Sequence, residues 1–409
     1  MTKLHPDYTM VIMIIGTIMV LTIAVKSWIR KTEIPALVVF LLLGFCLRLA
    51  DTQYGELFEG GESILDLFAK IGLITLLFKV GLESNIAGLL KQLRSASVVW
   101  AGNILISGML GYITAYYILG IQLITSIIIA TAFTATSVGV SVAVWESRQV
   151  LKSDNGELLI DVAALDDITA IVLMALLFAL LPHFREGFDA NLWPVIMGSA
   201  SGFLIKLLGF GLFCAVFSVF MEKRITSYFK KLESAPELIL VVVGISFIIA
   251  AFAEWIGFSF AIGAFFAGLV FSRDESAVKN EGSFMPLYEL FSPFFFIGIG
   301  MQISPEILGT GFTVCTVLIV AAIVSKIIAN GLPVWMMGNF QSAALIGISM
   351  VPRAEITMVI MQHGLDKGAW AVPPKIFNSM VFVCIATCAI APVVVQKMLT
   401  RWPQKESSQ

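Results

Sequence analysis

Long apolar runs recur along this 409-residue sequence, and the polar segments that separate them reach about a dozen residues at most. A hydrocarbon core about 30 Å thick is crossed by a helix of roughly 20 apolar residues, and helices satisfy their own backbone hydrogen bonds in lipid. Only 13% of the residues are charged, whereas soluble domains carry about 25%. The sequence therefore predicts an all-α polytopic membrane protein with no soluble domain between its spans.

Dividing the sequence into runs of this length predicts thirteen transmembrane spans. Their approximate limits are residues 8–28, 34–50, 64–83, 96–119, 122–145, 157–181, 193–221, 236–253, 255–272, 284–303, 311–337, 341–363 and 372–398.

Basic residues are concentrated in alternate loops, namely those that follow the odd-numbered spans. The intervening loops are poor in Lys and Arg and include the acidic segment DTQYGELFEGGE. By the positive-inside rule, the N-terminus is expected outside and the C-terminus in the cytoplasm. The formal net charge of −2 argues against a nucleic-acid partner, so the lipid bilayer is the macroscopic partner that we expect. The basic residues concerned are Lys26, Arg30, Lys31, Lys91, Arg94, Arg148, Lys152, Lys223, Arg224, Lys230, Lys231, Arg273 and Lys279, with Lys397, Arg401 and Lys405 near the C-terminus.

Three ionisable side chains, Asp166, Asp167 and Lys326, lie near the middle of predicted spans. Such a residue at a helix centre is unfavourable by roughly 2.5 to 3.5 kcal/mol on insertion scales, and by default it marks a functional site that has a partner. Asp166 is about nine residues, roughly 14 Å, from the cytoplasmic end of its span, and Lys326 is about eleven residues, roughly 16 Å, from the same surface. The matched depths favour an ion pair.

The two adjacent aspartates are expected to face different neighbours. Consecutive helical residues point about 100° apart, so one carboxylate can neutralise Lys326 while the other faces something else. The alternative, a buried salt bridge with a purely structural role, would explain one aspartate and leave the second unexplained.

The fifth span contains the segment TAFTATSVGVS, in which hydroxyl residues crowd a β-branched, Gly-containing stretch at mid-membrane. Helix propensity is weak there, so we expect an interruption near Thr134, Thr136 and Ser137. The alternative is that these hydroxyls bond back to their own helix, as Ser and Thr ordinarily do in a span.

The twelfth span contains ISMVPRAEITM, which places Pro352, Arg353 and Glu355 inside an apolar run. Proline breaks the helical hydrogen-bond ladder. Two interrupted helices seven spans apart run in opposite directions, which is typical of an inverted repeat, here spans one to six against eight to thirteen. Broken helices at a repeat interface indicate a transport site at the membrane midplane.

With TATSVGVS, ALDD, GFSFAIGAFFAGLVFSR, PFFFIGIGMQI, SKIIA and MVPRAEITM in this order, the sequence resembles bacterial monovalent cation:proton antiporters of the sodium/proton exchanger type with a double-aspartate motif. The resemblance covers nearly all of the chain. It implies a secondary transporter rather than an enzyme, in the cytoplasmic (inner) membrane, which exchanges Na⁺, and also Li⁺, for protons without a cofactor. It further implies electrogenic exchange by alternating access, and a homodimer.

The resemblance also implies roles for individual residues. Asp167 would be the principal cation and proton carrier, and Asp166 would pair with Lys326. The cation ligands would be Asp167, Asp166, Thr136 and Ser137, and the supporting residues beside them would be Thr134, Pro352, Arg353 and Glu355.

The family's two-bundle organisation can be transferred to the predicted spans. A core bundle would comprise residues 96–182 and 311–409, and a dimerisation bundle residues 1–95 and 236–310. Residues 183–235 would contribute a linker span between them.

One position departs from the family pattern. Lys79, in LLFKVGLES, stands where many relatives of this type carry an acidic residue. We expect Lys79 to pair with Glu83 one turn later or to extend to the membrane interface. The alternative is that the acidic charge is missing from the cytoplasmic mouth, which would alter ion selectivity or pH response.

Three other functions stay open at this point. A K⁺/H⁺ antiporter would have the same fold and differ in the size of its site. A passive cation channel is disfavoured, because a matched buried Asp and Lys would obstruct a conducting pore. An intramembrane enzyme would need a nucleophile with a base, or a metal site, and no such pairing at helical spacing lies inside a predicted span.

Overall fold

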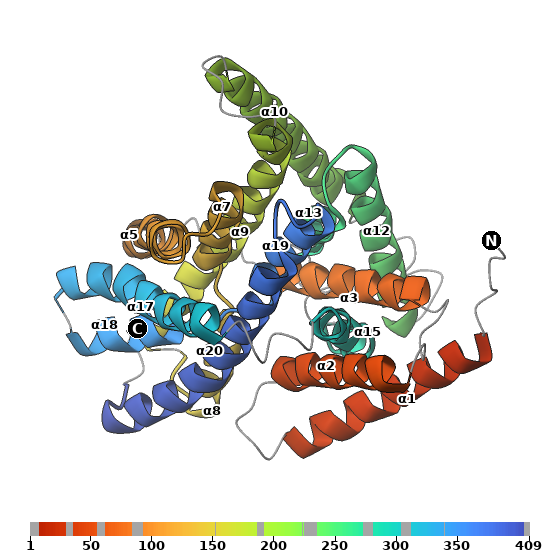
Figure 1. The fold of residues 1–409 in the computed structure, drawn as a ribbon, viewed down its shortest axis with the longest axis horizontal. Helices are drawn as coiled ribbons and strands as arrows, with labels where there is room; N and C mark the ends of the chain where they lie inside the picture. The colour runs from red at the N-terminus through yellow and green to blue at the C-terminus, as the bar shows by residue number, and fades with distance from the viewer. Residues whose placement is uncertain are drawn as a thin grey trace. The chain divides into compact units, whose positions relative to one another are not determined.

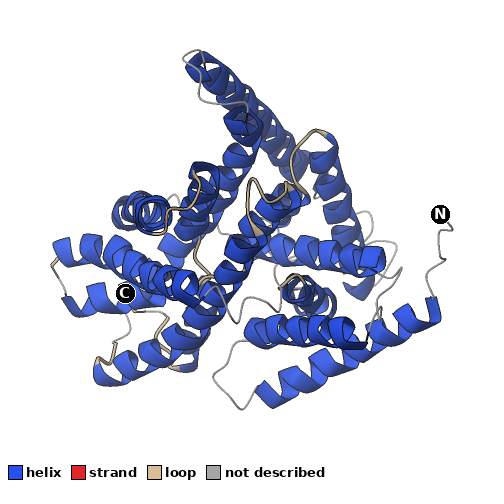
Figure 2. Cartoon of the chain, viewed as in Figure 1, coloured by secondary structure: helices blue, strands red, loops and turns tan. Residues whose placement is uncertain are grey.

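The computed structural model of the chain describes residues 8–29, 36–54, 62–83, 93–151, 153–185, 192–222, 224, 235–272, 281–303, 312–338 and 340–404. These residues form helices joined by short turns, and no strand occurs among them (Figure 2). The all-α prediction is therefore confirmed.

Helices occupy each of the thirteen predicted spans. Seven of the helices in the described residues are long and apolar enough to cross a membrane, by length and composition. In chain order (Figure 1) the elements are α1 (Tyr8–Ile29), α2 (Ala36–Tyr54), α3 (Glu62–Glu83), α5 (Leu93–Gly102), η1 (Asn103–Ser107), α6 (Gly108–Ile113), η2 (Thr114–Ile118), α7 (Leu123–Thr134), α8 (Val138–Ser147), α9 (Asp154–Arg185), α10 (Leu192–Val216), η3 (Phe217–Glu222), α12 (Ala235–Trp255), α13 (Phe260–Phe271), α15 (Glu281–Met301), α17 (Phe312–Met336), α18 (Phe340–Ser349), α19 (Glu355–Asp366) and α20 (Pro374–Arg401).

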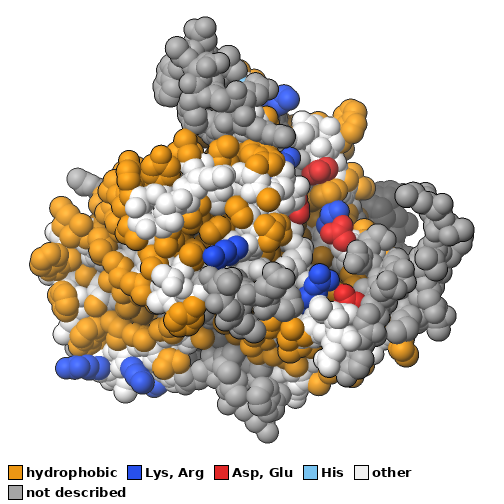
Figure 3. Space-filling view, viewed as in Figure 1, with side chains coloured by type: hydrophobic (Ala, Val, Ile, Leu, Met, Phe, Trp, Pro, Cys, Tyr) orange, Lys and Arg blue, Asp and Glu red, His pale blue; other side chains and the backbone are white. Residues whose placement is uncertain are grey.

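Hydrophobic side chains cover much of the face drawn in Figure 3, and few charged side chains interrupt them. On α10, for example, Ile205 is 70% exposed and Leu208 is 72% exposed. Soluble monomers rarely expose apolar patches of large extent. The surface is therefore that of a protein whose solvent is lipid.

The chain forms two compact units. The first unit comprises Met1–Thr22, Ala50–Ile86 and Ala175–Gly298, and the second comprises Ile23–Leu49, Ala87–Met174 and Ile299–Gln409.

In the first unit, α3 crosses α13 at a pair of glycines. A Cβ atom on Gly81 would meet the carbonyl oxygen of Phe265, and one on Gly268 would meet that of Phe78. Small residues allow membrane helices to approach with their backbones in contact. These glycines therefore set the spacing of the α3–α13 crossing.

In the second unit, α17 packs against α5, η1, α18 and α20. Its contact with α18 also depends on glycine: a Cβ on Gly331 would lie 3.0 Å from the carbonyl oxygen of Ala343, and one on Gly347 would lie 3.0 Å from that of Ile327. This close packing fixes α17, the helix that carries Lys326.

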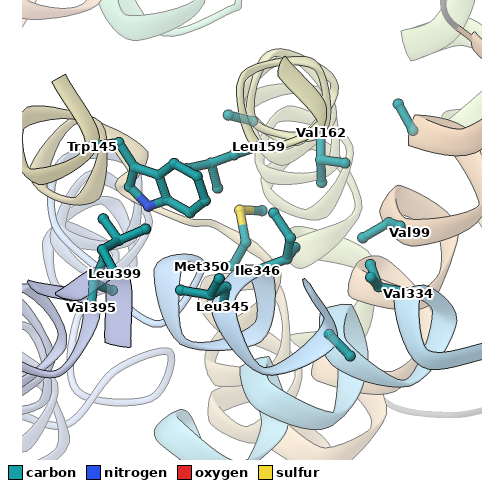
Figure 4. Close-up of a cluster of buried hydrophobic side chains, with 13 residues drawn as sticks. Val99, Trp145, Leu159, Val162, Val334, Leu345, Ile346, Met350, Val395 and Leu399 are labelled. Carbon is teal, nitrogen blue, oxygen red and sulfur yellow. The ribbon is translucent and has the colours of Figure 1, made fainter. Parts of the chain in front are cut away.

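A cluster of buried apolar side chains joins the short helices α8 and α18 to the long helices α9, α17 and α20 (Figure 4). At its edge, the indole Nε1 of the fully buried Trp145 donates a 2.9 Å hydrogen bond to Ser349 Oγ. The cluster holds one half of each interrupted helix in place. Its members are Ala96, Val99, Trp145, Leu159, Val162, Ala163, Val334, Ala343, Leu345, Ile346, Met350, Val395 and Leu399.

The fourth span is a continuous helical rod that contains two π-helical turns, η1 and η2. The residues at the junctions, Gly102, Ser107 and Ile113, all keep right-handed helical backbone angles. A π-turn rotates the side chains that follow it and is frequent at functional sites. Here η1 begins at Asn103, and both Asn103 and Ser107 are fully buried.

Candidate functional site

The fifth and twelfth spans are interrupted at the predicted positions. The chain leaves α7 after Thr134, is extended at Ala135 (φ −64°, ψ 145°) and re-enters a helix at Val138. The second break runs from Met350 to Ala354, between α18 and α19, and contains Pro352. The two breaks touch: the backbone N–H of Ser137 donates a 2.8 Å hydrogen bond to the carbonyl oxygen of Pro352.

The guanidinium of Arg353 caps the carboxyl end of α7. It donates to the carbonyl oxygens of Ala132 (3.2 Å), Phe133 and Ala135 (3.1 Å), and the side chain is fully buried. These carbonyls lie at the end of the helix, where they lack intrahelical donors and carry the negative end of the helix dipole. A fixed cation therefore neutralises this terminus within the membrane.

Glu355 supplies a negative charge at the amino termini of two helices. It lies in the first turn of α19, and its Oε2 accepts a 2.7 Å hydrogen bond from Ser137 Oγ, just before α8. Helix N-termini stabilise negative charge. The crossing thus places an anion between two amino termini and a cation at a carboxyl terminus.

Lys326 and Asp166 meet next to the first break, as their matched depths in the sequence suggested. Lys326 Nζ lies 3.7 Å from Asp166 Oδ2, and the side chains are 0% and 1% exposed. The ammonium also donates to the carbonyl oxygen of Thr134 at 2.6 Å and to Thr136 Oγ1. Four of the predicted residues, Asp166, Lys326, Thr134 and Thr136, therefore come together.

Asp167 differs from its neighbour in exposure. Asp166 is buried, whereas Asp167 on the same helix, α9, is partly exposed. The different environments agree with the 100° between consecutive helical side chains.

The hydroxyl residues of the fifth span divide into two groups. Thr131 and Thr134 bond back to their own helix, through Oγ1 to the carbonyls of Ile127 (3.0 Å) and Thr131 (2.8 Å). Thr136 and Ser137, which lie in the break, use their hydroxyls outside the helix. The alternative, in which the hydroxyl bonds back to its own helix, is therefore correct for Thr134. The backbone carbonyl of Thr134, rather than its hydroxyl, contacts Lys326.

Two amides that the sequence reasoning missed complete the polar cluster. Asn103, on η1, donates through Nδ2 to Asp166 Oδ1 (2.5 Å) and to the Thr134 carbonyl (3.1 Å). Asn330, one turn after Lys326 on α17, donates to Asn103 Oδ1 at 3.2 Å. The sequence feature that could have indicated them is an Asn side chain in the middle of an apolar run, at Asn103 and again at Asn330.

Lys79 belongs to the first unit and lies on α3, where its Nζ is 5.2 Å from the centre of the Tyr288 ring. A cation over an aromatic face is attracted by the ring quadrupole. The side chain of Glu83, its predicted partner, lies outside the described part of the structure.

A family model and two similar proteins of the sodium/proton exchanger type match this chain. The family model described as "Sodium/hydrogen exchanger, transmembrane" matches residues 15–401. The high-affinity Na⁺/H⁺ antiporter NhaS3 of Synechocystis is 27% identical over 87% of this chain and 76% of its own length. The Na⁺/H⁺-K⁺ antiporter GerN of Bacillus cereus is 29% identical over 82% of this chain and 83% of its own.

Among solved structures, the sodium proton antiporter MjNhaP1 of Methanocaldococcus jannaschii at pH 8 is similar to the chain. Its structure superposes with a TM-score of 0.67 at 16% identity and covers 96% of this chain and 97% of its own. The likeness in fold therefore extends over nearly the whole chain.

Proposed function

The chain belongs to the sodium/hydrogen exchanger family of transmembrane proteins, and on that premise we propose that it is a secondary active antiporter that exchanges Na⁺ for protons at Asp167. The observation that carries the proposal is the meeting of Asp166 and Lys326 beside two broken helices, with Asp167 the next residue on the same helix. A secondary transporter of this kind needs a carboxylate that binds either a cation or a proton, within a site open to one side at a time.

Competition at one carboxylate is sufficient for exchange. Protonation and cation binding use the same oxygens of Asp167, so occupancy by one excludes the other. The partial exposure of Asp167 supports its role as the exchanging group, because ions must reach it. The empty, charged site is unfavourable in the membrane, which disfavours movement without cargo.

The cation would be held by hard oxygen ligands, which suit small alkali ions. We assign carboxylate oxygens of Asp167 and Asp166, the hydroxyls of Thr136 and Ser137, and carbonyl oxygens freed by the breaks. Thr136 Oγ1 now accepts from Lys326, and Ser137 Oγ donates to Glu355. Cation binding would therefore exchange these hydrogen bonds for coordination.

Displacement of Lys326 connects cation binding to a second proton. When a cation occupies Asp166 and Thr136, the ammonium loses its counter-ion and one acceptor, and it can release a proton. More than one proton per cation follows, so we propose electrogenic exchange. Li⁺ is expected to act as a second substrate, because the same oxygen set accommodates it.

The larger-scale arrangement is also proposed. A core bundle of residues 96–182 and 311–409 would move against a dimerisation bundle of residues 1–95 and 236–310, joined by the linker at 183–235, in a homodimer. Charge alternation in the loops supports an outside N-terminus and a cytoplasmic C-terminus. We assign the protein to the cytoplasmic membrane of a bacterium, where it would serve pH homeostasis.

K⁺/H⁺ exchange is the second candidate. It is favoured by one observation, the name of the Bacillus cereus relative, which includes K⁺ beside Na⁺ and H⁺. A passive channel is a weaker candidate, because the buried Lys326 and Asp166 would lie in its path.

Current recordings on solid-supported membranes test the proposal. Purified protein is exposed to Na⁺, Li⁺ and K⁺ concentration jumps at several pH values. We expect transient currents with Na⁺ and Li⁺ and none with K⁺. Currents with K⁺ alone would support the second candidate, and conductance without coupled proton movement would support a channel.

A further inference from the structure

A neutral amide lies between the lysine and the aspartate of the site. Asn103 Oδ1 accepts a 2.8 Å hydrogen bond from Lys326 Nζ, while its Nδ2 donates to Asp166 Oδ1 at 2.5 Å. The charged atoms themselves, Lys326 Nζ and Asp166 Oδ2, are 3.7 Å apart, which is beyond hydrogen-bond distance. The ion pair is therefore bridged by the amide rather than joined by a direct hydrogen bond.

Asn103 is held rigidly in this bridging position. Its amide offers two donors and two acceptor lone pairs, and all four are used: the second N–H goes to the Thr134 carbonyl, and the second lone pair accepts from Asn330. The reversed amide would set its NH₂ group against the Lys326 ammonium. The contacts therefore fix both the position and the orientation of the amide.

The ammonium is surrounded by neutral oxygens. Its three hydrogen bonds go to Asn103 Oδ1, the Thr134 carbonyl and Thr136 Oγ1. Asp166 Oδ2, although buried, has no hydrogen-bond partner among the residues that the structure describes. The arrangement leaves a carboxylate oxygen that a cation can approach without first breaking a hydrogen bond to lysine.

We propose that Asn103 is a positioning residue that keeps Lys326 and Asp166 as a bridged pair and thereby sets the cation affinity of exchange. The inference rests on the proposed antiport function. Without the amide, Lys326 loses an acceptor and Asp166 loses a donor, so the two charges close into direct contact. A cation must then break that contact before it binds.

A matched control comes from the same pair of helices. Trp100 Nε1 donates a 2.8 Å hydrogen bond to Thr169 Oγ1, one turn away from the Asn103–Asp166 contact and between the same two spans. Trp100→Phe removes that hydrogen bond and touches neither Lys326 nor Asp166. It reports the effect of weakening the helix contact alone.

Two variants test the bridge in proteoliposomes. Asn103→Ala is expected to raise the apparent KM for Na⁺ about tenfold relative to Trp100→Phe, which corresponds to about 1.4 kcal/mol, with a smaller change in maximal rate. Asn103→Asp keeps the shape and adds a third carboxylate, and close carboxylates retain a shared proton. We expect its half-maximal activity to move to higher pH by about one unit, a change that a purely structural role would not produce.

The outcomes separate this inference from the function on which it rests. The inference is overturned if Asn103→Ala stays within about twofold of Trp100→Phe in KM and Asn103→Asp keeps the wild-type pH profile. If Asn103→Ala does not fold, the isosteric Asn103→Asp decides alone. If the wild-type protein moves no Na⁺, the proposed function fails, and the bridge is then tested by the melting temperature of Asn103→Asp against pH. A curve that parallels Trp100→Phe would overturn it.

Discussion

The backbone N–H of Ser137 donates a 2.8 Å hydrogen bond to the carbonyl oxygen of Pro352, so the two interrupted helices are joined at their breaks. The charges around this contact are arranged by helix polarity, with Arg353 at a carboxyl terminus and Glu355 at amino termini. The charges of Arg353 and Glu355 thus balance each other at the crossing, and Asp166 and Lys326 lie beside it.

The guanidinium of Arg353 should be required for the stability of the fold. Arg353→Lys leaves a single ammonium where a planar fork now reaches the carbonyls of Ala132, Phe133 and Ala135. The carbonyls of Ala132 and Phe133 keep the hydroxyl donors of Thr357 and Ser107, so the expected loss falls on the Ala135 carbonyl. A buried carbonyl left without a donor costs about 1 to 3 kcal/mol, so we expect a clearly lower melting temperature in detergent. Arg148→Lys, at an exposed position after α8, is the control and should melt like the wild type. Equal melting of the two variants would contradict the capping role.

Removal of Lys326 alone should destabilise the protein, and removal of Lys326 together with Asp166 should destabilise it less. Lys326→Met leaves Asp166 buried without its counter-charge, and breaking a buried pair costs about 3 to 5 kcal/mol. The double variant Lys326→Met/Asp166→Asn should recover much of that loss. Thermal unfolding of the wild type, both single variants and the double variant measures the coupling. Additive losses would show that the two side chains do not interact.

Asp166→Asn should weaken exchange without abolishing it. The carrier Asp167 remains, but Lys326 no longer has a counter-ion whose loss releases a proton. We expect fewer charges moved per cation, measured as a changed reversal potential in proteoliposomes with imposed Na⁺ and pH gradients. An unchanged reversal potential would separate Lys326 from the transported protons.

Much of this site could be predicted because its signals are local. Proline within an apolar run, hydroxyl crowding around TATSVGVS and three charges at mid-membrane each act on the few residues around them. The matched depths made an ion pair between Asp166 and Lys326 possible, and the family resemblance implied that pairing.

The amide bridge could not be predicted in the same way. An Asn in an apolar span can bond back to its own helix, and the role of Asn103 depends on which helices pack beside it. The π-turn that presents Asn103 has no periodicity of its own in a uniformly apolar run. The sequence pointed to the side chain of Thr134, whereas its backbone carbonyl is the group that contacts Lys326.

The glycine crossing in the first unit should tolerate no side chain. Gly268→Ala would place a methyl group against the carbonyl oxygen of Phe78, between two backbones that cannot separate without breaking the α3–α13 contact. We expect a destabilisation of about 1 to 3 kcal/mol, typical of overpacking. Gly202→Ala on α10, where nothing lies within 4 Å of the new Cβ, should unfold at or slightly above the wild-type temperature. A similar effect of the two substitutions would contradict the close crossing.

The most direct test of the account is Na⁺-driven proton flux through purified Asp167→Asn in proteoliposomes, compared with the wild type at matched protein density. The amide keeps the shape of the side chain, but it neither binds a proton nor neutralises a bound cation. We expect wild-type vesicles to exchange Na⁺ for protons and the variant, folded and reconstituted to the same level, to exchange none. Full exchange by Asp167→Asn would contradict the assignment of Asp167 as the carrier.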